Sequence, residues 1–370
     1  MKVLITGGAG FIGSHVANEL LAHGHSVRVL DSLIPQVHGP DRQRPAYLHR
    51  DVELIARDIR EPEVFEGSLD RVDAVVHLAA LVGAGQSTYR MADYTSVNNS
   101  GTACLLEALS THPVECLVVA SSMSLYGEGR YRNRAGDFVN VPERTVRQLK
   151  MGVWEVRDER GEPLTPVPTA EDKPPSLASI YALSKFDQER MCLIAGAAYE
   201  IPTVSLRLFN TYGPNQALSS PYTGVLSNFA SRVLNDSAPV IYEDGLQKRD
   251  FVSVYDVARA FRLALKTPSA AGQCFNISSG QAVTVKEAAQ LVLSSMGRTD
   301  IELVITGRYR EGDIRHCFAD TSLARKVLGW EPMMPVEEGL SDLAIWLAGQ
   351  TSVDRAIEAR AELAVRGLMV

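Results

Sequence analysis

Residues 6–13 have the sequence Thr-Gly-Gly-Ala-Gly-Phe-Ile-Gly and follow an apolar run at residues 3–5. Glycine recurs here at every third position. This spacing allows a tight turn, a close approach of the backbone to a pyrophosphate group and close packing of a helix on a strand. The helix expected after the turn would direct its unpaired N–H groups and its positive dipole end at the phosphates. The stretch therefore predicts the dinucleotide-binding turn of a Rossmann-type fold, with cofactor contacts at Gly7, Gly10, Phe11, Ile12 and Gly13.

Asp31 ends the next apolar run and lies 18 positions after Gly13. A carboxylate at that place accepts hydrogen bonds from both ribose hydroxyl groups and repels a 2′-phosphate. The two residues that follow, Ser32 and Leu33, lack the positive charge that NADP needs. The sequence therefore predicts NAD as the cofactor.

Apolar runs alternate with helical patterns through the first half of the chain. Strands are predicted at residues 3–6, 26–31, 52–55, 74–78, 117–121 and 203–208, and helices at 13–23, 62–68, 95–110 and 180–199. Continuous Val, Ile and Leu in strands separated by helices are typical of a parallel sheet covered on both faces. We therefore expect an α/β fold, a Rossmann-type doubly wound parallel sheet. Asp58 and Ile59 follow its third strand, where they would contact the adenine, although Asp58 could equally cap a loop.

We expect this sheet to form an NAD-binding domain at residues 1–206. Beyond it the rhythm becomes irregular, and short helical patterns at 222–235, 254–265 and 285–295 predict a smaller mixed α/β substrate-binding lobe at 207–345. The lobe is expected to be discontinuous, with the chain returning to the sheet at about 243–267. Residues 346–370 have the Ala, Leu, Glu and Arg composition of a C-terminal helical tail.

The interval at about 129–168 breaks the alternation. It is polar and has no clean period, with eight Lys and Arg against five Asp and Glu between Arg130 and Arg160. Long loops without structure are uncommon in compact domains unless they have a function. Two interpretations stay open: a flap inserted beside the active site, or a surface excursion with no part in catalysis.

Composition excludes several classes of function. The formal charge of −7 over 370 residues argues against a nucleic-acid-binding surface. No stretch approaches the roughly 20 apolar residues that span a bilayer, so no membrane partner is expected. The five cysteines stand far apart without a CxxC pair, which is typical of a reducing compartment and predicts no metal site. We therefore expect a cytoplasmic enzyme.

Tyr181 and Lys185 lie four positions apart in Tyr-Ala-Leu-Ser-Lys, which places them on one face of a helix. A phenol with a free pKa near 10 is a poor base at neutral pH. The lysine ammonium and a positively charged nicotinamide ring would lower that pKa, so that Tyr181 could act as acid and base. Taken alone, the pair is equally well explained as two residues on a helix surface.

Hydroxyl groups cluster at the end of the predicted strand at 117–121, as Ser121, Ser122 and Ser124. In open α/β sheets, ligands bind at the carboxyl ends of the strands. Ser122 would hydrogen-bond the reacting hydroxyl group and pass its proton toward Tyr181. Without its neighbours, a serine cluster indicates only the capping of a strand end.

With these residues, the sequence resembles the extended short-chain dehydrogenase/reductase family, in particular its NAD-dependent nucleotide-sugar epimerases and dehydratases. The resemblance covers residues 1–345, and the interval at 129–168 is its main departure. It rests on TGGAGFIGSH (6–15), HLAA (77–80), VNNSGT (97–102), SSMSLYG (121–127), YALSK (181–185), RLFNTYGPNQ (207–216), RDFVSVYDVA (249–258), REGD (310–313) and LGWEP (328–332).

The resemblance implies a role for each matching residue. Ser122, Tyr181 and Lys185 would form the catalytic triad, and Lys185 would also hold the nicotinamide ribose. Further cofactor contacts are implied at Leu78, Ala79, Ala80, Asn98 and Ser121. The nucleotide-sugar substrate, linked to dTDP or UDP, would contact Ser124, Asn210, Arg249, Arg310, Asp313 and Cys317, with the two arginines holding the diphosphate.

The reaction depends on the two residues after Ser122. The dehydratases of the family have an Asp-Glu pair where this chain has Met123 and Ser124, and related decarboxylases carry a glutamate at the second position. Elimination of water needs a carboxylic acid to protonate the leaving group. The resemblance therefore implies either 4-epimerisation through a transient 4-keto sugar or simple reduction of a keto sugar by an NAD(P)-dependent ketoreductase.

The segment GDIRHCFAD (312–320) and the long insert are most similar to the branch that acts on dTDP-6-deoxyhexoses such as dTDP-L-rhamnose. The small Cys317 stands where related enzymes control the width of the sugar pocket, although a buried cysteine there could simply pack. UDP-hexoses, hexosamines or uronates are alternative substrates, and an NAD-sensing regulatory protein is the non-enzyme alternative. A homodimer is implied by analogy, through the helices at 95–110 and 180–199.

Overall fold

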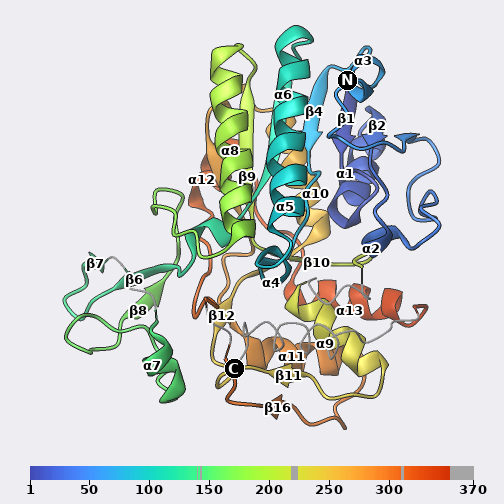
Figure 1. Ribbon diagram of the computed structural model, residues 1–370. Coiled ribbons are helices and arrows are strands. Elements are labelled where there is room, and N and C mark those ends of the chain that lie inside the picture. Colours follow the sequence, from blue (N-terminus) through green and yellow to red (C-terminus); the bar gives the residue numbers. More distant parts are fainter. Residues whose placement is uncertain (140, 142–143, 218–223, 310–311, 351–370) are drawn as a thin grey trace.

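A seven-stranded parallel sheet lies at the centre of the computed structural model, which describes residues 1–139, 141, 144–217, 224–309 and 312–350 (Figure 1). The strand order is β14-β9-β5-β4-β1-β2-β3. The bounds are β1 (Lys2–Thr6), β2 (Ser26–Leu30), β3 (Glu53–Ile55), β4 (Ala74–His77), β5 (Cys116–Ser122), β9 (Thr203–Leu208) and β14 (Cys274–Ile277). The direction of strand addition reverses between β1 and β4, which is the place where open α/β sheets bind ligands. The predicted fold class is confirmed.

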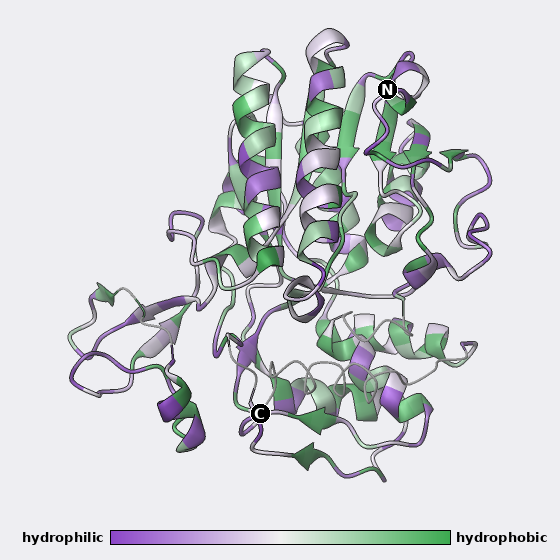
Figure 2. Cartoon of the chain, in the orientation of Figure 1, coloured by the Kyte–Doolittle hydropathy of each residue, from purple (hydrophilic) through white to green (hydrophobic). Residues whose placement is uncertain are grey.

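Successive side chains of each strand enter two different cores, because they point to opposite faces of the sheet. Val3 and Ile5 pack on one face with helices α1 (Phe11–Ala22), α10 (Val254–Leu265) and α12 (Ser322–Leu328). Leu4 packs on the other face with α3 (Val64–Ser68), α6 (Gly101–Thr111) and α8 (Ile180–Ala198). Strands of the sheet are mostly hydrophobic, whereas the helices and loops around them mix hydrophobic and hydrophilic residues (Figure 2). Truncating Leu4 to alanine would cost about 2–5 kcal/mol of stability.

The chain returns to the sheet first with a helix and then with a strand. The predicted return at about 243–267 supplies helix α10, which packs on α1. The strand that joins the sheet is β14, next to β9. A short apolar strand such as Cys-Phe-Asn-Ile has no periodicity that separates it from its surroundings, so its place depends on pairing with β9.

The short helices around the sheet connect its strands. They are α2 (Pro35–His38), α4 (Ala84–Ser87), α5 (Met91–Tyr94), the π-helical segment η1 (Thr95–Ser100), and the 3₁₀ turns η2 (Met123–Tyr126) and η3 (Pro268–Ala270). The predicted helix at 95–110 thus begins as a π-helical segment before α6. Such segments occur frequently at functional sites.

The C-terminal lobe lies below the sheet in Figure 1 and has its own core. Helices α9 (Val225–Leu234), α11 (Val285–Ser295) and α13 (Val336–Leu347) pack together there. Paired short strands complete it: β10 (Asn210–Tyr212) with β13 (Phe251–Ser253), β11 (Val240–Ile241) with β16 (Val304–Ile305), and β12 (Lys248–Arg249) with β15 (Val283–Thr284). Most of the predicted tail, residues 351–370, lies outside the described residues.

The interval at 129–168 forms a small subdomain that projects to the side of the sheet (Figure 1). We call it the insert. Its three antiparallel strands are β6 (Arg130–Arg132), β7 (Phe138–Val139) and β8 (Thr165–Val167). Helix α7 (Val146–Lys150) lies between β7 and β8 in the chain. Tyr131, Val156 and Leu164 form a separate apolar cluster inside it. Among the described helices, none is long and apolar enough to cross a membrane.

Candidate active site

The glycine turn between β1 and α1 leaves no room for side chains where the backbone must approach other groups. Gly7 has a φ of +69°, and a Cβ atom on it would lie 2.8 Å from the backbone of Ala79. A Cβ atom on Gly13 would lie 2.5 Å from the Gly7 carbonyl oxygen. Gly10 is the N-cap of α1, and no side chain caps the N–H groups of Phe11 and Ile12. The turn therefore presents free donors and the positive end of a helix, as a diphosphate requires.

Asp31 lies beside this turn at the carboxyl end of β2. Its carboxylate accepts hydrogen bonds from the backbone N–H groups of Ala9 (3.0 Å) and Leu33 (2.9 Å), which hold it in place. His38 Nε2 lies 3.8 Å away, and burial lowers the pKa of this imidazole, so it adds no fixed charge. Sequence reasoning missed Arg42, whose guanidinium donates to the carbonyl groups of Ser32 and Leu33. No local pattern connects this arginine to Asp31.

Asp58 lies after β3 and is engaged by a neighbour. Its carboxylate accepts from Arg60 Nη2 (2.6 Å) and Nε (2.9 Å), and the bond from this guanidinium lowers the Asp58 pKa. Ile59 is buried, and a Cβ atom on Gly101 would clash with it. The adenine contact of these two residues stays a prediction.

The end of β4 runs alongside the glycine turn. The N–H of Leu78 donates to the Thr6 carbonyl (3.0 Å), and the N–H of Ala79 lies 3.3 Å from the Thr6 hydroxyl oxygen. Ala80 follows them on the chain. These backbone contacts place the segment at the strand-order reversal.

Three hydroxyl groups meet where β5 ends and α8 begins. Ser122 is the last residue of β5 and lies close enough to the Tyr181 phenol to lower its pKa, and the Ser124 hydroxyl donates to Ser122 Oγ at 2.9 Å. The N–H of Tyr181 donates to Ser87 Oγ at 3.0 Å, which anchors the start of the helix. Burial raises the pKa of Tyr181, and Ser122 lowers it. Ser121 precedes this group and is buried in β5.

Lys185 lies one turn along α8 and is almost fully buried. Its ammonium donates to Gln188 Oε1 at 2.7 Å, and burial lowers its pKa to about 8. Sequence reasoning missed Gln188, although its i,i+3 spacing from Lys185 was a signal that the two side chains share a helix face.

A chain of neutral groups continues from Gln188 to the glycine turn. The Gln188 amide donates to Thr102 Oγ1 (2.8 Å), and His77 bridges Thr102 Oγ1 (2.8 Å) and Thr6 Oγ1 (2.7 Å). Burial first, and the nearby Lys185 charge second, lower the His77 pKa to about 3, so its ring is neutral. The catalytic helix and the dinucleotide turn are thus connected through buried hydrogen bonds.

Asn98 lies in the π-helical segment η1 and is fully buried. Its side chain accepts from the N–H of Leu81 (2.7 Å) and donates to Ser184 Oγ (2.9 Å). Ser184 in turn donates to the Tyr181 carbonyl (2.9 Å). Asn98 therefore joins the end of β4 to the helix that carries Tyr181 and Lys185.

The predicted substrate residues lie on the C-terminal side of this site. Asn210 Nδ2 donates to the Asp250 carbonyl at 2.9 Å and is half-buried. Arg249 donates to the carbonyl groups of Lys248, Ile314 and Arg315, which leaves its charge available to an anion.

Asp313 is half-buried, and its carbonyl accepts from Arg144 Nη2 at 2.7 Å. Cys317 is fully buried and packs with Met123, Leu125, Tyr126 and Phe209. Its effect on the width of the sugar pocket stays a prediction. Arg310 lies outside the described residues. No cluster of potential metal ligands occurs among the residues that the structure describes.

Comparisons with known proteins agree with this arrangement. A family model described as the NAD-dependent epimerase/dehydratase family matches residues 3–148 and 158–278, and its interruption falls in the insert. A protein of Burkholderia thailandensis named dTDP-L-rhamnose 4-epimerase is 34% identical over 352 residues, which cover 94% of this chain and 95% of the relative.

Solved structures of similar proteins share the fold. The UDP-glucose 4-epimerase of Thermotoga maritima, solved with UDP-glucose, has a TM-score of 0.77 at 28% identity and covers 94% of this chain and 99% of its own. The UDP-glucose 4-epimerase of Thermus thermophilus, solved with NAD, has a TM-score of 0.74 at 30% identity and covers 95% and 100%.

Proposed function

Because this chain belongs to the NAD-dependent epimerase/dehydratase family, we propose that it is a nucleotide-sugar 4-epimerase that acts on a dTDP-6-deoxyhexose. The proposal is supported by helix α8, which carries Tyr181 and Lys185 one turn apart and places Tyr181 beside Ser122 at the end of β5, and by Met123 and Ser124 where a dehydratase needs carboxylic acids.

The glycine turn supports NAD as the cofactor, because its residues fit a dinucleotide. Gly7, Gly10 and Gly13 allow the diphosphate to approach the backbone, and Phe11 and Ile12 offer N–H groups to it. Asp31 would accept the ribose hydroxyl groups. Leu78, Ala79 and Ala80 would line the cofactor beside β4. When bound, NAD accepts the hydride from carbon 4 and returns it, so that the reaction has no net redox change.

Tyr181 is proposed to take the proton of the 4-hydroxyl group through Ser122 and to give it back after the sugar has turned. Burial raises the Tyr181 pKa, so the phenol needs positive charge nearby before it can act as a base. The Lys185 ammonium, one helical turn away, and the nicotinamide ring would supply that charge. Ser124 would keep Ser122 oriented through their 2.9 Å hydrogen bond.

The substrate would be anchored by its diphosphate while the flat 4-keto sugar rotates. Arg249 has the planar guanidinium that suits phosphate oxygens. Arg310, Asp313 and Asn210 are proposed to complete the nucleotide contacts. The dTDP-6-deoxyhexose is favoured over UDP-hexoses by the 34% identity to the Burkholderia protein.

The test is to incubate the purified protein with panels of dTDP- and UDP-sugars, without added cofactor, and to follow the configuration at carbon 4 by proton NMR. Interconversion of a pair of dTDP-6-deoxyhexoses at constant redox state is expected. Consumption of NAD(P)H with a 4-keto sugar, and no interconversion, would instead identify a ketoreductase.

We also propose a homodimer that pairs α6 and α8. Leu183 and Ile194 of α8 and Tyr199, its C-cap, expose 42%, 60% and 52% of their surface, and such apolar residues along one helix suit a subunit interface. Sedimentation velocity would distinguish a dimer from a monomer. The five cysteines are all free, which supports a reducing compartment such as the cytoplasm.

A further inference from the structure

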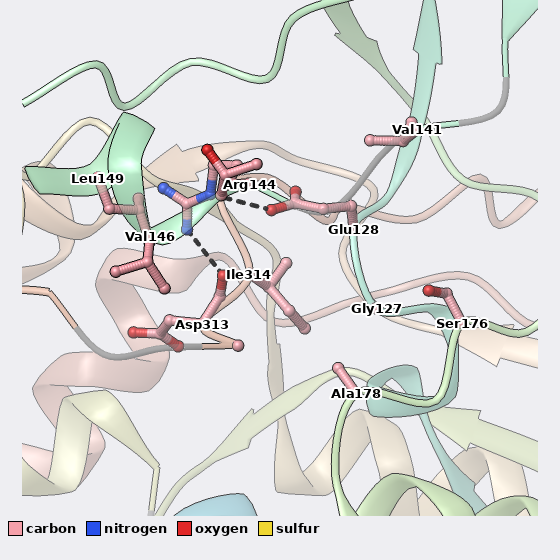
Figure 3. A pocket seen from close by; sticks show the side chains of 12 residues that line it. Gly127, Glu128, Val141, Arg144, Val146, Leu149, Ser176, Ala178, Asp313 and Ile314 are labelled. Atoms are coloured by element: carbon pink, nitrogen blue, oxygen red, sulfur yellow. Dashed lines mark hydrogen bonds and ion pairs between the residues drawn. The ribbon is translucent and has the colours of Figure 1, made fainter. Parts of the chain in front are cut away.

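A cavity of about 260 Å³ lies where the insert meets the rest of the molecule. Figure 3 shows that side chains of the insert, the loop before α8 and the C-terminal lobe face one another across it. Pockets for whole drug-sized ligands have volumes of about 300–1,000 Å³. This cavity therefore suits one sugar ring or its substituents, and not a complete nucleotide sugar.

Three walls of the cavity belong to segments that carry the candidate active site. Gly127 directly follows the turn with Ser124, and Ala178 lies three positions before Tyr181. The backbone of Ser176 bonds that of Leu125 at 2.8 Å, which holds these two segments together. Ile314 lines the third wall, and its carbonyl accepts a hydrogen bond from Arg249, the candidate diphosphate residue. A sugar held by its diphosphate at Arg249 would therefore extend beside this cavity.

The fourth wall is the insert, which contributes Val141, Arg144, Val146 and Leu149. Arg144 holds it in place because its buried guanidinium donates to Glu243 Oε1 (2.8 Å) and to the carbonyl of Asp313 (2.7 Å). The insert thus cannot move away without breaking charged hydrogen bonds with the C-terminal lobe.

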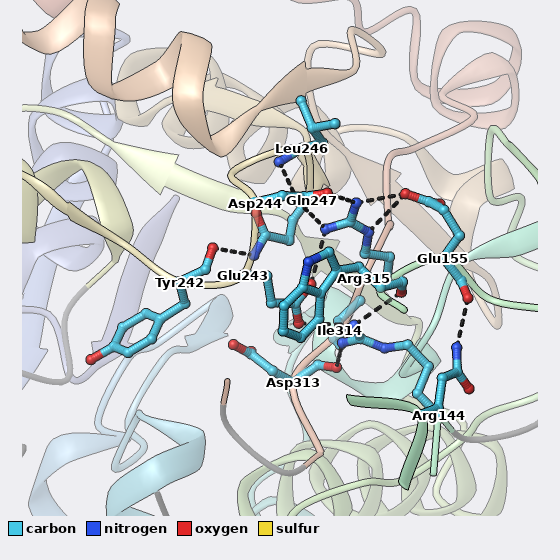
Figure 4. Close-up of polar contacts among 12 residues, drawn as sticks. Arg144, Glu155, Tyr242, Glu243, Asp244, Leu246, Gln247, Asp313, Ile314 and Arg315 are labelled. Carbon is cyan, nitrogen blue, oxygen red and sulfur yellow. Dashed lines mark hydrogen bonds and ion pairs between the residues drawn. The ribbon is translucent and has the colours of Figure 1, made fainter. Parts of the chain in front are cut away.

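A second arginine strengthens this attachment (Figure 4). Arg315 is fully buried and donates to Glu155 of the insert (2.5 Å) and to Glu243 (2.9 Å) and Asp244 (2.7 Å) of the lobe. Glu155 also accepts from His316 Nε2 at 3.0 Å, because the other ring nitrogen of His316 accepts the N–H of Lys248. These contacts favour a fixed wall over a surface excursion.

The chemistry of the lining is apolar and acidic. Val141, Val146, Leu149, Ala178 and Ile314 supply hydrocarbon surface, and Glu128 and Asp313 supply carboxylates. Among the described lining residues, Arg144 is the one cation, and its guanidinium is already engaged by Glu243, Glu128 and two carbonyl groups. A ligand carboxylate would meet two like charges here, and the described lining residues offer it no unpaired cation, whereas hydroxyl and methyl groups need none.

We propose that this cavity is a subsite for the carbon-6 end of the hexose and accepts it when it carries no carboxylate. The insert would thereby select neutral or 6-deoxy sugars and reject uronates. The inference rests on the proposed function, which it extends from the nucleotide sugar to the class of its sugar.

Val146 offers a direct test, because it lines the cavity, is 37% exposed and lies at the first position of α7. Val146→Trp would fill the cavity, and Val146→Lys would add a cation to it. Met151 is the C-cap of the same helix, is 62% exposed and does not line the cavity, so Met151→Trp and Met151→Lys are matched controls.

Calorimetry would compare the affinities of dTDP alone, a dTDP-6-deoxyhexose, UDP-glucose and UDP-glucuronate in the full-length, NAD-loaded protein. We expect Val146→Trp to weaken binding of the neutral nucleotide sugars on the order of tenfold, about 1.4 kcal/mol, and to leave dTDP unchanged. Val146→Lys should improve UDP-glucuronate relative to the neutral sugars several-fold. The Met151 variants should behave as the wild type.

The proposal is overturned if Val146→Trp changes no sugar affinity relative to the nucleotide, or if the wild type prefers UDP-glucuronate. If no sugar is epimerised, the proposed reaction is refuted, but the binding results still test the subsite. If sugars are epimerised and the Val146 variants have unchanged affinities, the reaction is supported and the subsite is refuted.

Discussion

Two buried polar networks in this molecule treat charge in opposite ways. In the network behind α8, the Lys185 ammonium donates to the neutral amide of Gln188, which in turn leads to Thr102 and His77. In the network between the insert and the C-terminal lobe, every charge faces an opposite one, and Arg315 alone binds Glu155, Glu243 and Asp244.

The pKa values follow this difference. Burial lowers the pKa of the Lys185 ammonium to about 8, so that its charge is easily changed near neutral pH. Glu155, bonded first of all to His316 and also to Arg315, has its pKa lowered to about 2 and keeps its charge. A reacting site benefits from the first arrangement, and a structural attachment benefits from the second.

The largest effect on activity should come from removing the hydroxyl oxygen of Tyr181, which lies on the same helix as Lys185. Tyr181→Phe should lower the rate of epimerisation by about 10²–10⁴-fold, because the general acid and base is lost. The stability should barely change. Proton NMR of carbon 4 and urea unfolding measure the two quantities.

Tyr126→Phe is the matched control, since its buried hydroxyl bonds Asn276 and Arg207 and lies outside the proposed machinery. It should cost about 1–3 kcal/mol of stability and leave most of the rate. Equal losses of rate in both variants would contradict the role of Tyr181.

Breaking the second network should cost stability. Arg315→Met removes the guanidinium that Glu155, Glu243 and Asp244 share, and removal of one partner of a buried ion pair typically costs about 3–5 kcal/mol. Urea unfolding and proteolysis of the insert would measure this. Arg157→Met is the control within the insert, because Arg157 is exposed and its guanidinium donates to the Gly161 carbonyl, with no ion pair among the described residues. Unfolding curves that coincide for both variants would show that the ion cluster does not hold the insert.

The charge of Lys185 should set the alkaline limit of activity. Its folded pKa is lowered, so the ammonium loses its proton as the pH rises through about 8, and kcat/KM should fall there. Gln188→Glu places a carboxylate on the ammonium and should move this limit upward by about one to three pH units.

Gln188→Met removes the hydrogen bond without adding charge, so its alkaline limit should not rise. Arg315→Met should leave the limit where it is in the wild type, although it destabilises the fold. A limit that stays in place in Gln188→Glu would show that Gln188 does not control the charge of Lys185.

The smallest effect concerns Glu155, which is 40% exposed at its side chain. Glu155→Gln should cost less than about 1 kcal/mol, as for other exposed ion pairs. Because the folded pKa is lowered, the contribution is present above the ordinary pKa of about 4.3 and is lost as the pH falls toward about 2. Hydrogen exchange of the insert from pH 7 to pH 3 should show the two proteins converging; a difference that grows on acidification would contradict this.

Local pattern was sufficient for much of the fold. The strand at residues 203–208 and the helix at 254–265 are found at those residues, because continuous apolar runs and a 3.6-residue period are read from neighbours in sequence. Strand β14 was not predicted, since its four residues become a strand only by pairing with β9.

The site divides in the same way. The sequence by itself determined the candidate groups, because the glycine spacing, the Tyr181–Lys185 interval and the serines after β5 are set by chemistry within a few positions. Only the tertiary structure decided their surroundings. Gln188 accepts the hydrogen bond of Lys185, Arg42 donates to the carbonyl of Ser32 next to Asp31, and Arg144 and Arg315 attach the insert to the lobe. Most of those contacts join residues from different elements, such as Glu155 and Arg315, which lie 160 positions apart. Burial and charge compensation depend on where the folded chain brings such groups together, and no local period encodes that distance.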